Sequence, residues 1–70
     1  MTERKEHLQW CKDRALEYVN AGDPANAVAS MLSDMNKHEG TKLDPMFAMM
    51  GMMEIERGSE AVRRWVNGFN

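Results

Sequence analysis

The sequence predicts an all-α fold, a small bundle of three main helices with a short helix at the C-terminus. Apolar residues recur at steps of three and four positions along most of the chain, which is the period of a helix with one buried face. The pair Asp-Pro, a typical helix start, occurs at Asp23-Pro24 and again at Asp44-Pro45. No segment alternates apolar and polar residues as a half-buried strand would.

The first helix is expected from about Glu3 to Ala21. Thr2 is its expected N-cap, and Gly22 stands where a left-handed residue ends a helix. The positions expected to face inward are Leu8, Cys11, Ala15 and Val19.

The second helix is expected over about Pro24 to His38, antiparallel to the first, because only a short turn at Gly22 separates them. Ala27 and Ala29 flank its apolar stripe and would permit close approach of another helix. Residues 40–43 form the expected loop that follows. The positions expected to face inward are Ala25, Val28, Met31, Leu32 and Met35.

The third helix, roughly Met46 to Arg57, is apolar nearly all round and holds five of the eight methionines in the chain. A helix without a polar face is expected to be shielded from water on nearly every side. Gly51 in its middle suggests that another backbone passes close there. Either the core of one chain covers this helix, or a second copy or a partner helix does, and the shortness of the chain favours association.

The fourth helix is expected from about Glu60 to Asn67, after Gly58-Ser59, with Ser59 as its cap and Gly68 as its stop. Its apolar residues are spaced so that the helix can close over the core. These residues are Val62, Trp65, Val66 and Phe69.

Length and composition restrict the classes of protein that fit. Seventy residues form a single domain, residues 1–70, near the lower limit for an unaided hydrophobic core. Cys11 is the sole cysteine, so an intrachain disulfide and a Cys/His zinc site are not expected. The net charge of −2 and the scattered basic residues argue against nucleic-acid binding. The chain shows no signal-peptide or membrane-span pattern, which predicts a cytoplasmic protein with no membrane partner.

No set of residues predicts catalysis, a cofactor or a metal, so the chain is not expected to be an enzyme. Ser30 and Ser33 occur without a glycine elbow or a suitably placed histidine. Cys11, on the inward stripe, is expected to behave as a small buried hydrophobe. His7 and His38 make a weak metal signal, and His38 is better interpreted as a solvated residue at a helix C-terminus.

Several residues are candidates for contact with a partner. Trp10 lies off the apolar stripe of the first helix, where it either lies flat over a neighbouring helix end or anchors a binding partner. Arg63 and Arg64 are candidates to bind an anion, although such arginines are commonly the wet face of a helix. The predicted partner or oligomer interface consists of Trp10, Met46, Met49, Met50, Met53, Trp65 and Phe69.

One local spacing resembles a tetratricopeptide unit. Small, aromatic, glycine, small and large residues stand at Ala15, Tyr18, Gly22, Ala27 and Met31. Asp34 and Glu39 occupy the places where such a unit has a small residue and a proline. A single unit cannot bury its own face, so the resemblance implies shared packing geometry rather than a repeat protein.

A second resemblance rests on residues 14–23 (RALEYVNAGD), 29–34 (ASMLSD), 37–38, 51–53 (GMM) and 65–70 (WVNGFN). These segments are similar to a family of small phage and prophage proteins, most of them uncharacterised. The resemblance implies an intracellular accessory role during infection and transfers no active site.

Together these features lead to the hypothesis of a phage-encoded binding protein. It would self-associate as a dimer or higher oligomer and engage or modulate a host or phage protein, conceivably a defence component of the host. One alternative is an oligomer that sequesters nucleotide signals in pockets between subunits, with Arg63, Arg64 or Lys37 contacting phosphate. Another is a structural or assembly component of the virion.

Overall fold

The computed structural model describes residues 3–69 and confirms the all-α fold. Within these residues the chain forms helices and no strand. The expected N-cap Thr2 lies outside the described residues. The elements in order are α1 (Glu3–Asn20), α2 (Pro24–Met35), the 3-10 helix η1 (Glu39–Thr41), α3 (Pro45–Ile55) and α4 (Ser59–Asn67).

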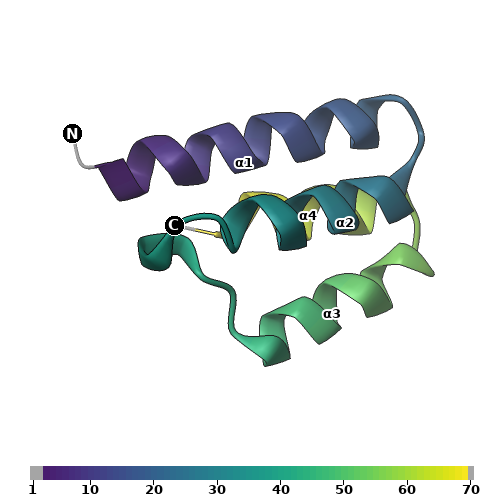
Figure 1. Cartoon of the computed structure of the whole chain (residues 1–70). Coiled ribbons are helices and arrows are strands. Elements are labelled where there is room, and N and C mark those ends of the chain that lie inside the picture. The colour runs from purple at the N-terminus through teal and green to yellow at the C-terminus, as the bar shows by residue number, and fades with distance from the viewer. Residues whose placement is uncertain (1–2, 70) are drawn as a thin grey trace.

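The helices are arranged so that α2 and α4 lie between α1 and α3 (Figure 1). The first two helices run antiparallel, as the short turn between them predicted. Helix α3 lies on the opposite side of the molecule from α1, next to α2 and α4. One long side of α3 is therefore left without a neighbour among residues 3–69.

Both Asp-Pro pairs start a helix as predicted. The Asp23 carboxylate accepts a hydrogen bond from the backbone N–H of Asn26 at 3.1 Å, and the Asp44 carboxylate accepts one from Met46 at 2.8 Å. Each proline is the first helical residue, where its missing N–H removes no bond. Gly22 has a φ of 76° and ends α1 in the left-handed region.

Several helix ends differ from the expected positions. Helix α2 stops at Met35 and not at His38, because the chain turns at Asn36 and the Thr41 hydroxyl donates a hydrogen bond of 2.8 Å to the Met35 carbonyl. Part of the expected loop is the 3-10 helix η1. His38 is its half-buried N-cap, so its interpretation as a solvated end of α2 was wrong.

The remaining boundaries differ by one or two residues. Helix α1 ends at Asn20, one residue earlier than expected, and α3 ends at Ile55 rather than at Arg57. Ser59 is the first residue of α4 and not its cap. Gly58 holds the cap position without a side-chain hydrogen bond.

The core lies between α1, α2 and α4. All four predicted inward residues of α1 are buried. In α2 the prediction was wrong for Ala25, which is exposed. Leu32 is half-buried and packs against the core, and the flanking Ala27 is fully buried. The main core cluster contains Leu8, Cys11, Ala15, Val19, Ala27, Val28, Met31, Met35, Val62 and Val66.

The expectation that α3 is shielded on nearly every side is wrong for the isolated chain. Gly51 is its only buried residue, and six of its large apolar side chains are 48% to 70% exposed. The reason is geometric, since α2 and α4 cover one side of α3 and α1 lies beyond them. The close neighbour of Gly51 is the indole ring of Trp65 rather than a second backbone.

Candidate functional site

The exposed side of α3 is a continuous apolar surface. Met46, Met49, Met50 and Met53 are three or four residues apart, so they share one face of the helix, with Met52 beside them. Their exposed fractions lie between 48% and 70%. We call these five residues the methionine face. No charged residue occurs in α3 before Glu54.

A concave site adjoins the methionine face. It has a volume of about 410 Å³ and lies where the start of α3 meets the end of α4. The Phe69 ring meets Phe47 and Trp65 edge to face, with ring centroids 6.1 Å and 5.2 Å apart. We call this site the aromatic cleft; its lining residues are Phe47, Met50, Arg64, Trp65, Gly68 and Phe69.

Trp65 is held in place by α3. Its indole N–H donates a hydrogen bond to the Phe47 carbonyl at 3.2 Å, and its ring packs against Gly51. Met50 belongs to both the methionine face and the aromatic cleft, so the two surfaces are continuous. The structure therefore brings together six of the seven predicted interface residues, all except Trp10.

The two arginines of α4 have different surroundings. Arg63 donates one hydrogen bond to the Glu60 carboxylate at 3.1 Å and another to the Asn20 side-chain oxygen at 2.9 Å. Arg64 is exposed, lines the aromatic cleft, and has no side-chain hydrogen bond or ion pair within residues 3–69. The predicted anion contact thus has one available guanidinium, that of Arg64.

Trp10 lies apart from this surface, among cationic and imidazole side chains. Its ring stacks on His7 with centroids 5.4 Å apart, and the Arg14 guanidinium carbon lies 4.8 Å from the ring centroid. The Lys37 ammonium lies 5.5 Å from the same ring. These contacts agree with the alternative that Trp10 lies flat over neighbours. Its role as an anchor stays a prediction, because 41% of the residue remains exposed.

Asp34, beside this cluster, is a buried carboxylate that sequence reasoning missed. It accepts hydrogen bonds from Arg14 at 2.8 Å, Lys37 at 3.1 Å and Ser30 at 3.3 Å. Burial alone would raise the pKa of Asp34, but the hydrogen bonds and charges of Lys37 and Arg14 outweigh it, so the pKa lies below its ordinary value of 3.8. The missed signal is the spacing of Ser30, Asp34 and Lys37, four and three residues apart, which brings a hydroxyl and an ammonium to the carboxylate.

The two histidines hold the end of α2 against α1. The His7 Nε2 lies 2.7 Å from the Asp34 carbonyl oxygen, and because a carbonyl can only accept, Nε2–H is the donor. The His38 Nδ1 accepts the Gly40 N–H at 2.9 Å, and the two imidazoles stack with centroids 5.3 Å apart. No group of three or more His, Cys, Asp or Glu residues able to hold a metal occurs within residues 3–69.

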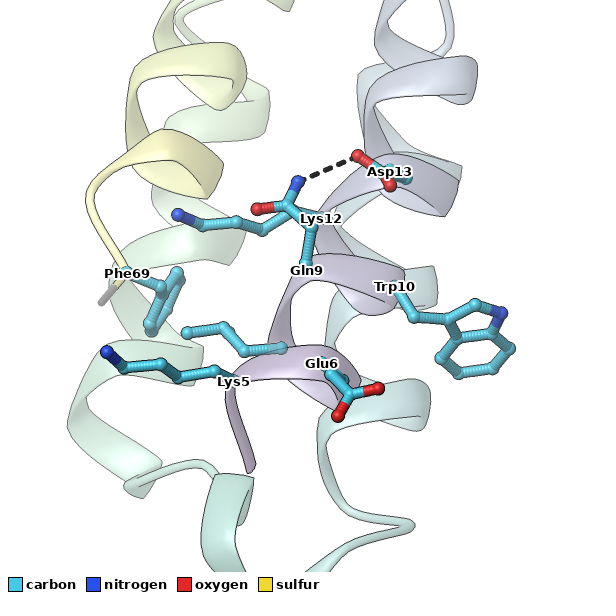
Figure 2. Close-up of a pocket in the computed structure, with 8 residues that line it drawn as sticks. Lys5, Glu6, Gln9, Trp10, Lys12, Asp13 and Phe69 are labelled. Atoms are coloured by element: carbon cyan, nitrogen blue, oxygen red, sulfur yellow. Dashed lines mark hydrogen bonds between the residues drawn. The ribbon is translucent and has the colours of Figure 1, made fainter. Parts of the chain in front are cut away.

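A second hollow, of about 680 Å³, lies between α1 and the C-terminal Phe69 (Figure 2). The Lys5 and Lys12 side chains extend on the Phe69 side of α1, whereas Trp10 points away on the other side. Gln9 donates a hydrogen bond to Asp13 at 2.9 Å, one turn further along α1. Phe69 lines both this hollow and the aromatic cleft.

Cys11 is fully buried, as predicted, and burial together with the nearby Asp34 charge raises the pKa of its thiol from 9.0 to about 11. A neutral, enclosed thiol is a poor nucleophile. In the part of the chain that the structure describes, no helix has both the length and the apolar character needed to cross a bilayer.

Comparison of the chain with protein-family models, with curated proteins and with solved structures finds no match in any of the three.

Proposed function

We propose that this chain is a protein-binding accessory protein that takes a segment of its partner into the aromatic cleft. The observation that supports the proposal is an apolar surface that continues from α3 into the cleft, with the Arg64 guanidinium at its edge. Monomeric proteins seldom expose contiguous apolar patches larger than a few hundred Å² unless the patch binds something. Aromatic residues and arginine are also the residue types most enriched at the centres of protein interfaces.

The composition of the cleft defines the partner it fits. Phe47, Trp65 and Phe69 offer ring faces and edges to a large apolar side chain. Arg64 supplies a charge for a carboxylate next to that side chain. The proposed ligand is therefore a protein segment with an apolar anchor and an acidic residue beside it.

The resemblance to small phage proteins supports a further part of the proposal, that the partner is a host protein encountered during infection. In this hypothesis the chain acts in the cytoplasm of the infected cell and occupies or modulates that protein, and the first candidates to test are the host's defence components. No catalytic step is proposed.

Capture of partners from host lysate by the immobilised chain tests the proposal. Arg64→Glu and Met50→Glu should each reduce capture at least tenfold, because one reverses the charge of the cleft and the other places a charge inside it. Arg57→Glu makes the same charge change at an exposed site outside the cleft and should retain capture. Equal capture by all four proteins, or none by the parent, would refute the proposal.

A second candidate function, sequestration of a nucleotide signal, is favoured by one observation. Aromatic rings beside a guanidinium can stack a base and bind a phosphate, and about 410 Å³ is in the range of small-ligand sites. The other two predicted phosphate contacts are engaged, Arg63 with Glu60 and Lys37 with Asp34. A rise in melting temperature with a cyclic nucleotide that disappears in Arg64→Glu would favour this function over protein binding.

A further inference from the structure

We propose that the methionine face is the contact surface for a second copy of this chain, paired through antiparallel α3 helices on a two-fold axis between Met49 and Met50. This inference concerns the outer side of α3 and does not rest on the function proposed for the aromatic cleft.

The exposed area matches what a stable dimer requires. The five methionines are each exposed by about half or more, which amounts to on the order of 600 Å², at the lower end of the roughly 600–1,000 Å² per partner in a standard-sized interface. Methionine side chains are flexible and polarisable, so they can interdigitate with identical side chains across such a contact. A second α3 would cover Met46, Met49, Met50 and Met53, which share one side of the helix.

The pattern of the face suits a two-fold axis. The spacing of Met46, Met49, Met50 and Met53 is three, one and three residues, which reads the same in both directions. Antiparallel pairing would set Met46 opposite Met53 of the second copy, and Met49 opposite Met50. Because a two-fold axis brings residues near their own copies, a charge there would repel itself, and residues 45–53 carry none.

The instability of α3 alone supplies a physical reason for pairing. It has 11 residues, whereas isolated helices shorter than about 12–15 residues are marginal in water and depend on packing for stability. Its own chain buries Gly51 and partly covers Ala48, Glu54 and Ile55. A second copy would supply the missing apolar contacts and enlarge a core that is small for an unaided domain.

Solution mass tests the association. Light scattering across a range of concentrations should give twice the 8.0 kDa of one chain. Met49→Glu should halve that mass, because it places two like charges next to the axis. Ala29→Glu, on an exposed position of α2, should leave the mass unchanged. A monomer at all concentrations, or a dimer unaffected by Met49→Glu, would overturn the proposal.

Cysteine cross-linking tests the register. Met49→Cys and Met50→Cys should each form a disulfide-linked dimer on mild oxidation, since their copies are offset by about one residue rise along the helix. Met46→Cys is the matched control and should not cross-link, because the two copies of residue 46 would lie about 10 Å apart along the helix axis. The native Cys11 is fully buried and does not compete. Efficient cross-linking of Met46→Cys instead would show parallel pairing and refute the antiparallel arrangement.

The two proposals can fail separately. If the parent protein is monomeric but captures a host partner through Arg64, the proposed dimer is refuted and the proposed function is retained. If the protein is a dimer that cross-links as expected but captures no partner, the proposed dimer is retained and the proposed function is refuted.

Discussion

The indole ring of Trp65 occupies the space above Gly51 in which any other residue would carry its β-carbon. The same indole donates its N–H to the backbone of Phe47, one helical turn earlier in α3. Trp65 is therefore both the packing contact and the hydrogen-bonded link between α3 and α4. The smallness of residue 51 sets the distance between the two helices.

Gly51→Ala should lower the free energy of unfolding by about 1–3 kcal/mol, the usual cost of overpacking. Alanine is the better helix former by about 1 kcal/mol, so a loss of stability would show that the steric effect outweighs the propensity. Urea unfolding followed by Trp fluorescence measures it. Ser33→Ala, at an exposed helical site, is the control and should change stability by less than about 0.5 kcal/mol. A stabilised Gly51→Ala protein would show that Trp65 does not occupy this position.

Asp34→Asn should cost about 3 kcal/mol at pH 7, because it removes a buried carboxylate from Arg14 and Lys37. The pKa of Asp34 is lowered in the folded protein, so its contribution is present above the unfolded value near 3.9 and is lost as the pH falls below it. The difference from the parent protein should therefore shrink between about pH 5 and pH 2. Urea unfolding at several pH values checks this, with Glu17→Gln as the exposed control. A difference independent of pH would contradict the ion-pair assignment.

Cys11 should resist alkylation in the folded protein, because its thiol is enclosed and its pKa is raised to about 11. At pH 8 we expect a thiol reagent to react at least 100-fold more slowly with the native protein than with the urea-unfolded chain. A raised folded pKa also means that this residue stabilises the fold below pH 9 and that the contribution is lost as the pH rises towards 11. Rapid native labelling would show that α1 is not packed as described.

Trp10→Ala distinguishes the two alternatives for this residue. Loss of the ring contacts with His7, Arg14 and Lys37 should lower stability by about 1 kcal/mol and leave partner capture unchanged. Denaturation and lysate capture on the same variant give both results. Unchanged stability together with lost capture would identify Trp10 as an anchor.

The elements of the fold could be predicted because their signals are local. The carboxylates of Asp23 and Asp44 cap the first amides of α2 and α3 whatever lies around them. The period of Leu8, Cys11 and Ala15 likewise identifies the buried side of α1. Such features depend on neighbours in the sequence, and the structure confirms them.

Other features depend on contacts that no local pattern contains. Aspartate is a residue type that is usually exposed. Asp34 is buried because Arg14 of α1 donates a hydrogen bond to its carboxylate, and no local pattern in α2 shows that contact. The sequence of α3 correctly predicted an apolar helix. It did not predict how much of that helix is exposed, because exposure depends on how many other helices of the chain pack around it. The aromatic cleft required the C-terminal Phe69 to meet Phe47 from α3, a contact between residues 22 positions apart.

The placement of α1 and α3 on opposite sides of the molecule has a consequence for valency. Two chains joined back to back through α3 would carry their α1 helices at the far ends of the assembly, facing in opposite directions. If Trp10 on α1 anchors a partner, the dimer would display that anchor twice, once at each end. Because the two ends face apart, such a dimer would bridge two separate targets and would not gain avidity on a single surface.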